Sequence, residues 1–256
     1  MNFFFGISNK FFESTLTIPK FQNNGLKSKK YYPFEAYINE KKWHYQKANF
    51  TENGDFFFIE EKQINNEKIF FLSNHNEVFD KKYDKDKLQF FNNYTKTSPV
   101  NFRCNLRITF DGKGFSSYQS EYPLDMVNKK GNILSPLSVL LNTEADQNFL
   151  FFRNIYSEPI KKFFKIFFYN LKTKTIVNTT QVLTNESNLI NIDKGYINED
   201  IYIFSDGFLG IPIFISLKNN HLSMEHTHPP HHYILSENKF KIITKLKNEI
   251  KNQIFK

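Results

Sequence analysis

The residues best suited to chemistry lie in one histidine-rich stretch, His221 to His232. It reads HLSMEHTHPPHH and holds five of the seven histidines in the chain. In a strand, residues two apart share a face, so His226 and His228 are expected to point the same way. Neutral imidazole binds zinc, iron, copper and nickel, and such a pair can place two nitrogens on one ion.

The two prolines in this stretch indicate where a third metal ligand could come from. Pro229 and Pro230 cannot continue a strand ladder, and they hold the chain extended. His231 then lies where the chain can bend back toward the pair. The predicted metal ligands are therefore His226, His228 and His231, with zinc or iron as the candidate ion. The other interpretation is a histidine-rich strand end at the surface or in a subunit interface.

The spacing of the histidines is similar to that of the His-x-His strand in cupin barrels. Two features depart from the cupin motif: His232, four residues after His228, stands where that motif has glutamate, and no later strand carries a histidine. The chain is therefore not assigned to that family.

Three arginines stand out against a lysine-rich background. Of 34 basic residues, only Arg103, Arg107 and Arg153 are arginine. A planar guanidinium binds carboxylate or phosphate through a two-pronged fork that lysine cannot reproduce. With Glu121, these arginines are the predicted ligand-binding residues, for an anionic or carbohydrate-like ligand. The alternative is ordinary surface charge, because exposed ion pairs contribute little to stability.

Two acidic residues could do acid–base work. Glu121 and Asp125 lie four residues apart in an irregular segment, residues 118–147, which is either a functional loop or a connector. Acidic residues in such segments also serve in turns and caps, and that role stays open here.

Composition narrows the class of protein. The net charge of +8 suggests an anionic partner, but the lysines are spread along the chain and accompany many Asn, Ile, Phe and Tyr residues, as in an A/T-rich genome. No aromatic–basic sheet face typical of nucleic-acid binding is legible. The single cysteine, Cys104, fits a reducing, cytoplasmic location and is expected to be an inert core residue. The opening segment lacks the features of a signal peptide, and no apolar run reaches the length of a membrane span.

The elements that must position these residues are mostly strands. The clearest is residues 101–110, where Phe102, Leu106 and Phe110 belong to an apolar face and Arg103 and Arg107 to the opposite polar face. Alternating or apolar runs separated by turn residues predict further strands at 15–18, 33–38, 43–46, 56–59, 69–72, 115–118, 149–155, 163–169, 175–183, 188–192, 200–204, 211–217 and 221–226. A short strand near 90–91 is a further expectation.

The end of the sequence predicts a helix. Ser236 is expected to cap residues 237–255, in which Ile243, Leu246, Ile250 and Ile254 form one apolar stripe opposite lysines. Such a stripe packs either on the strands or on a partner, so a homo-oligomer formed through this helix is one expectation.

These patterns predict an all-β fold with two sandwich-like β halves, an irregular connecting segment and a C-terminal amphipathic helix. The predicted domains are residues 1–147 and 148–256. Two functions remain open. One is a binding or assembly protein that holds an anionic or carbohydrate-like ligand. The other is a metal-dependent enzyme that uses the His226–His228 pair, although no nucleophile elbow or phosphate-binding loop accompanies it.

Overall fold

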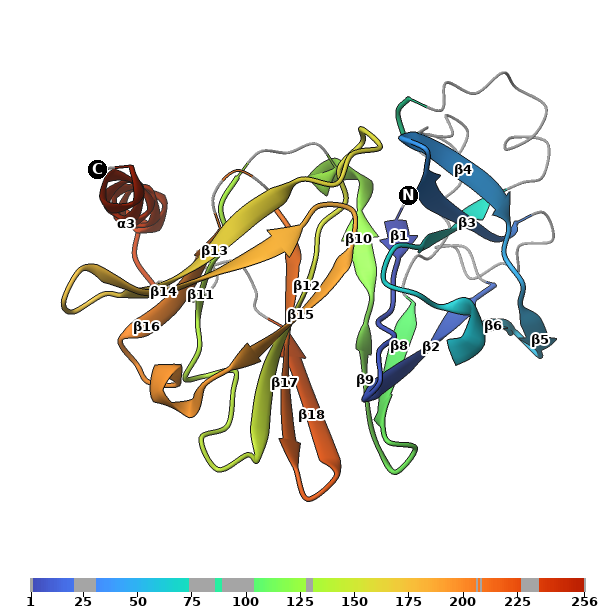
Figure 1. Cartoon of the computed structure of the whole chain (residues 1–256), viewed down its shortest axis with the longest axis horizontal. Coiled ribbons are helices and arrows are strands. Elements are labelled where there is room, and N and C mark those ends of the chain that lie inside the picture. The colour runs from blue at the N-terminus through green and yellow to red at the C-terminus, as the bar shows by residue number, and fades with distance from the viewer. Residues whose placement is uncertain are drawn as a thin grey trace. The chain divides into compact units, whose positions relative to one another are not determined.

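The computed structural model describes residues 2–20, 31–73, 86–88, 104–127, 131–205, 207, 209–226 and 235–255. Its contacts divide the chain into two compact units. Unit 1 comprises Met1–Asn128, Ile155–Lys161 and Asn185–Ser187, and unit 2 comprises Lys129–Asn154, Lys162–Thr184 and Asn188–Lys256. Among the described residues, the strands form four small sheets (Figure 1). The predicted boundary near residue 148 stays a prediction.

Unit 1 contains two five-stranded antiparallel sheets. The first has the order β10 (Glu121–Pro123), β1 (Asn2–Phe4), β7 (Ile69–Ser73), β3 (Tyr32–Asn39) and β4 (Lys42–Lys47). The second has the order β5 (Thr51–Asn53), β6 (Phe56–Ile59), β2 (Phe12–Pro19), β8 (Asn105–Phe110) and β9 (Gly114–Gln119). Two short 3-10 helices, Glu61–Gln63 and Leu124–Met126, accompany them.

The second sheet of unit 1 has one apolar and one polar face. Phe12, Leu16 and Ile18 of β2 are completely buried, as are Leu106 and Ile108 of β8. Their intervening neighbours are exposed or half-buried. This alternation is what a sheet with one buried face requires. It confirms the predicted alternation over residues 104–109. Phe110 is half-buried, and Phe102 and Arg103 lie outside the described residues.

Asn185 joins the two distant pieces of sequence in unit 1, Ile155–Lys161 and Asn185–Ser187. Its side-chain amide donates to the carbonyls of Glu158 (3.1 Å) and Ile160 (2.9 Å), and its Oδ1 accepts from the Tyr156 amide (2.7 Å). Asn185 is almost completely buried and has a φ of 59°, a left-handed conformation that Asn adopts more readily than most residues. One side chain therefore fixes the backbone of residues 156–160.

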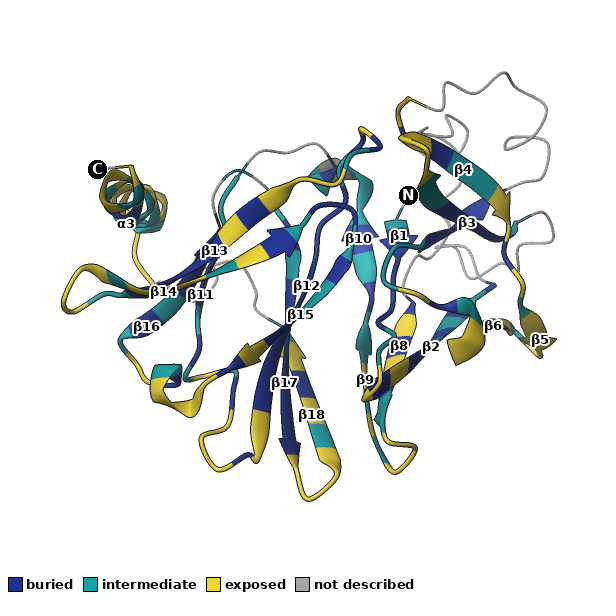
Figure 2. Cartoon of the chain, viewed as in Figure 1, coloured by how far each residue is buried: buried dark blue, intermediate teal, exposed yellow. Residues whose placement is uncertain are grey.

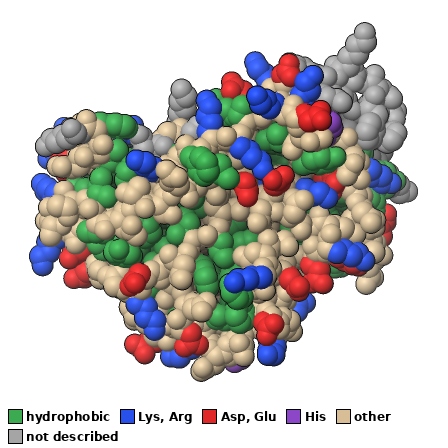
Figure 3. Space-filling view, in the orientation of Figure 1, with side chains coloured by type: hydrophobic (Ala, Val, Ile, Leu, Met, Phe, Trp, Pro, Cys, Tyr) green, Lys and Arg blue, Asp and Glu red, His purple; other side chains and the backbone are tan. Residues whose placement is uncertain are grey.

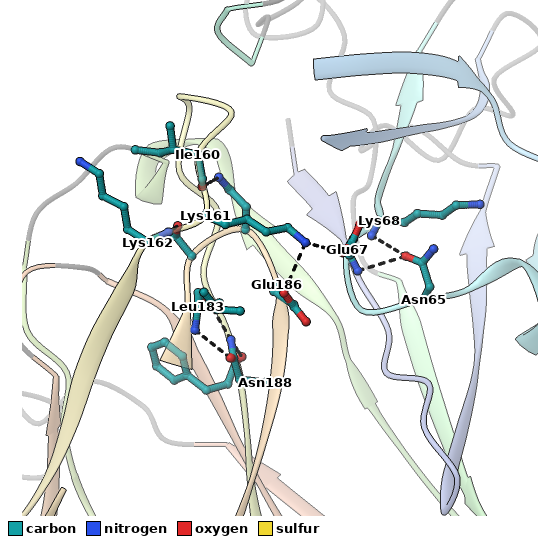
Figure 4. Close-up of polar contacts among 12 residues, drawn as sticks. Asn65, Glu67, Lys68, Ile160, Lys161, Lys162, Leu183, Glu186 and Asn188 are labelled. Atoms are coloured by element: carbon teal, nitrogen blue, oxygen red, sulfur yellow. Dashed lines mark hydrogen bonds and ion pairs between the residues drawn. The ribbon is translucent and has the colours of Figure 1, made fainter. Parts of the chain in front are cut away.

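Ion pairs and backbone contacts anchor the same pieces. Lys161 Nζ contacts the carboxylate of Glu67 and lies 3.6 Å from that of Glu186 (Figure 4). The Ser157 carbonyl accepts from the buried Trp43 indole at 2.7 Å, and Ser187 Oγ donates to the Gly6 carbonyl at 2.7 Å. These contacts tie residues 155–161 and 185–187 to Gly6, Trp43 and Glu67 of the same unit.

Unit 2 contains two four-stranded sheets among its described residues. One has the order β11 (Leu134–Pro136), β16 (Ile201–Ser205), β13 (Phe163–Asn170) and β14 (Thr175–Leu183). The other has the order β15 (Ser187–Ile192), β12 (Gln147–Arg153), β17 (Ile211–Lys218) and β18 (His221–His226). A 3-10 helix, Lys194–Tyr196, precedes β16. One hydrophobic cluster includes Phe164 and Ile203 from the first sheet and Leu150 and Phe214 from the second, and β17 is buried along six consecutive residues (Figure 2).

The C-terminal helix α3 (Lys239–Ile254) covers the opposite face of the β13 sheet (Figure 1). A second hydrophobic cluster contains Leu246, Ile250 and Ile254 of the helix together with Phe167 and Phe204 of the sheet. Along β13 and β16, Phe167 and Phe204 alternate with residues of the first cluster, so they lie on the other face. The predicted apolar stripe therefore packs on strands of the same unit. The predicted cap was wrong: the helix begins after Asn238, and Ser236 Oγ instead accepts from the Asn238 amide.

The described residues confirm a mostly β chain with a C-terminal helix. All the strands predicted within the described residues are present, and β6, β14 and β18 contain the predicted ranges 56–59, 175–183 and 221–226 without a shift. The structure adds β1, β5, β10 and β11, each only three residues long. The strand expected near residues 90–91 lies outside the described residues.

Candidate ligand-binding sheet face

The polar face of the β5-β6-β2-β8-β9 sheet is the candidate site, and we call it the Arg107 face. Strand register places its side chains in rows, because directly paired residues of antiparallel strands share a face. One row is Thr15–Arg107–Ser117, the next is Thr17–Asn105–Gln119, and a third is Glu13–Thr109–Phe115. Phe58 and Thr51 extend the second row across β6 and β5.

Arg107 lies on β8, the fourth of the five strands, and its guanidinium contacts an aromatic ring. Its guanidinium carbon is 4.1 Å from the centroid of the Phe115 ring. Arg107 pairs with Ser117, so Phe115, two residues away on β9, is its diagonal neighbour. Phe115 is 58 % exposed. A guanidinium stacked on an aromatic face keeps its edge donors available to a ligand.

The other side chains of the face are short and polar. They are hydroxyl or amide groups from four strands, exposed or half-buried: Thr15, Thr17, Thr51, Asn105, Thr109, Ser117 and Gln119. A second exposed aromatic residue, Phe56, lies 6.4 Å from Phe58 between ring centroids on the same face. The arrangement offers many hydrogen-bonding groups, with aromatic rings at two places.

One end of the face is acidic. Glu13, in the row beside Arg107, makes a side-chain hydrogen bond with Glu61, and this bond and the repulsion from Glu61 raise the pKa of the Glu13 carboxyl above its ordinary value. Asp111, in the β8–β9 turn, adds a smaller contribution in the same direction. The negative charges at this end oppose a highly charged anionic ligand.

The remaining predicted ligand-binding residues do not join this face. Arg153 ends β12 in unit 2 and is completely buried. Glu121 pairs with Phe4 in the other sheet of unit 1. Cys104 is completely buried, as expected for an inert core residue. Burial raises the pKa of its thiol, and the negative charge of Glu121 raises it further. Arg103 and the side chain of Asp125 lie outside the described residues.

The histidine stretch is described only in part. His226 is the half-buried last residue of β18 and pairs with Ile213, while His228 and His231 lie outside the described residues. Among the residues that the structure describes, no group of three or more His, Cys, Asp or Glu side chains could hold a metal ion. The three-histidine site therefore stays a prediction.

The charges on the face drawn in Figure 3 do not point to a polyanionic partner. On the face drawn in Figure 3, Lys and Arg side chains are interspersed with Asp and Glu. No helix in the described part of the chain is long and apolar enough to cross a membrane.

Comparisons with known proteins do not narrow the function further. No family model, curated protein or solved structure matches the sequence. The function must therefore be argued from the residues themselves.

Proposed function

We propose that the protein is a binding protein that holds a carbohydrate-like ligand on the Arg107 face. The observation that carries this proposal is the stacked Arg107–Phe115 pair, exposed on a sheet face lined by hydroxyl and amide groups. Each half of the chain would act as a sandwich-like scaffold. The shared core cluster of the two unit 2 sheets supports this arrangement for that unit.

The chemistry of the face suits a sugar. Hydroxyl and amide side chains both donate and accept hydrogen bonds, as sugar hydroxyls do. The rings of Phe115 and Phe56 offer apolar area for the C–H faces of a pyranose, with little loss of side-chain entropy on binding. Arg107 can bind a carboxylate or two neighbouring hydroxyls through its fork.

The charge balance favours a neutral sugar or one with a single acidic group. The face has one central cation, and Glu13, with its neighbours Glu61 and Asp111, lies at one end. Each further negative group on a ligand would meet repulsion there, because like charges within a Debye length of about 8 Å are poorly screened. A sulfated polymer is therefore a poor fit.

An array of immobilised oligosaccharides with neutral, single-uronate and polysulfated members tests the proposal. We expect binding to neutral or single-uronate members. Phe115→Ala should weaken it about tenfold, equivalent to about 1.4 kcal/mol. Arg107→Lys should weaken binding of the single-uronate members by a similar factor, because lysine lacks the fork.

The matched control for this experiment is Lys113→Ala. Lys113 is an exposed cation on the same hairpin, and its ammonium lies 3.2 Å from the Asp111 carboxylate. This variant should bind like the wild type. Equal binding by all three variants, or binding to polysulfated members alone, would contradict the proposal.

A further inference from the structure

The outer edge of the β13 sheet is formed by a strand with unusual composition. β14 pairs with β13 on one side and is the last strand of its sheet. Its nine residues, TIVNTTQVL, carry no charge and no proline. Five of them are exposed: Thr175, Val177, Asn178, Thr179 and Gln181 (Figure 2). Natural edge strands usually carry charges, prolines or covers that prevent pairing with another chain.

The register shows which backbone groups of β14 point outward. The Thr184 amide donates to the Lys162 carbonyl at 2.9 Å, which makes this a hydrogen-bonded pair. Such pairs alternate along an antiparallel ladder, so residues 178, 180 and 182 bond to β13. Residues 179, 181 and 183 therefore direct their N–H and C=O groups away from the sheet.

The two ends of this outward row are closed. At Leu183, the Asn188 side chain accepts from the amide and donates to the carbonyl, both at 2.9 Å (Figure 4). At the other end the register shifts between the partners of Phe168 and Tyr169, which leaves Val177 as an extra, bulged residue. Within the described part of the chain, the open part of the edge is thus residues 178–182, with Thr180 at its centre.

We propose that β14 pairs antiparallel with β14 of a second copy of this chain, about a twofold axis at Thr180. Thr179 of each copy would then exchange two backbone hydrogen bonds with Gln181 of the other. The Asn178 Oδ1 that now accepts from the Thr179 amide at 2.8 Å would be released. The two Thr180 side chains would meet directly across the axis.

A second copy fits this edge because the open segment is symmetric about one residue. A twofold interface uses the same patch on both subunits, so the bulge and the Asn188 cap of one copy would lie opposite the cap and bulge of the other. Because β14 has no charged residue, no like charges would face each other across the axis. Several other edge strands differ in this respect: β4 has Lys42 and Lys47, and β18 has Glu225.

Charge substitutions at the axis test the pairing in the full-length chain, with mass in solution measured by analytical ultracentrifugation. The wild type should shift from 30.5 kDa to twice that mass as its concentration rises through the micromolar range. Thr180→Lys and Thr180→Glu should each be monomeric, because like charges would face each other across the axis. An equimolar mixture of the two variants should recover the dimer.

A proline substitution tests the edge independently of charge. Gln181→Pro removes an outward N–H and no bond to β13, so it should abolish the dimer and leave the circular dichroism spectrum unchanged. Ser117→Pro is the matched control on β9, an uncharged edge strand of unit 1 whose residue 117 also points its amide outward. This control should still dimerise. A monomeric wild type, open-ended association, failure of the mixture to pair, or loss of the dimer in Ser117→Pro alone would overturn the proposal.

Discussion

The packing of helix α3 on the β13 sheet predicts the effect of one substitution, Ile250→Ala. Ile250 is completely buried among Phe167, Tyr169 and Phe204. The substitution removes three carbons, and each buried methylene contributes about 0.8 kcal/mol, so the lost transfer free energy is about 2.4 kcal/mol. The cavity left behind brings the total loss of unfolding free energy to about 3–4 kcal/mol. For a chain of this size, the melting temperature should fall by roughly 6–16 °C.

The same helix provides a matched control. Ile242 is 46 % exposed, and Ile242→Ala makes the same chemical change in the same helix. Both substitutions bring the same small gain in helix propensity, so their difference isolates packing. Ile242→Ala should cost less than about 1 kcal/mol. The assay is urea unfolding of both variants followed by far-UV circular dichroism. Equal losses in the two variants would refute the packing of α3 on the sheet.

Three further predictions concern buried groups and the histidine stretch. Burial raises the pKa of the Cys104 thiol, so the folded state favours the neutral thiol. The free energy of unfolding should therefore fall as pH rises above about 9, where the thiol of the unfolded chain ionises. Urea titrations of Cys104→Ala should show a weaker pH dependence than those of the wild type. Asn185→Ala removes three hydrogen bonds to the partly buried backbone of residues 156–160 and should cost about 3 kcal/mol in the same assay. A loss below about 1 kcal/mol would show that residues 156–160 do not depend on it. If the predicted metal site exists, tag-free protein should hold stoichiometric metal, and the His226→Ala/His228→Ala variant should lose it. The affinity for the metal should fall below about pH 6.5. Equal metal content in both proteins would assign the site to other residues.

Local patterns in the sequence predicted most of the strands. The run at 175–183 and the alternation around Arg107 could be predicted because turn residues and period-two burial are local signals. Three of the strands that were missed, β1, β10 and β11, depend on distant partners: Asn2 pairs with Pro123, and Leu134 pairs with Phe204. The fourth, β5, pairs with the next strand along the chain. A three-residue strand has too few positions to show a period, so only the pairing identifies it.

The candidate site could be predicted only in part for the same reason. Alternation placed Arg107 on a polar face, but the contact with Phe115 depends on the register between β8 and β9. Arg153 stays a predicted ligand-binding residue, but it is buried at the end of β12 and does not lie on the Arg107 face; the continuous apolar run of β12 is what a strand buried on both faces shows. Asn185 gave only a turn signal, because the carbonyls that it binds lie 25 or more residues away in sequence.

The most direct test of the proposed function is threonine-methyl NMR of the full-length protein, titrated with the tightest-binding oligosaccharide of the array. Thr15, Thr17 and Thr109 lie on the Arg107 face, while Thr179 and Thr180 lie on β14 and provide an internal reference. We predict that the methyl signals of the first three shift with the ligand and that those of the other two stay in place. Shifts confined to residues outside the Arg107 face, or an array on which no oligosaccharide binds, would contradict the proposal.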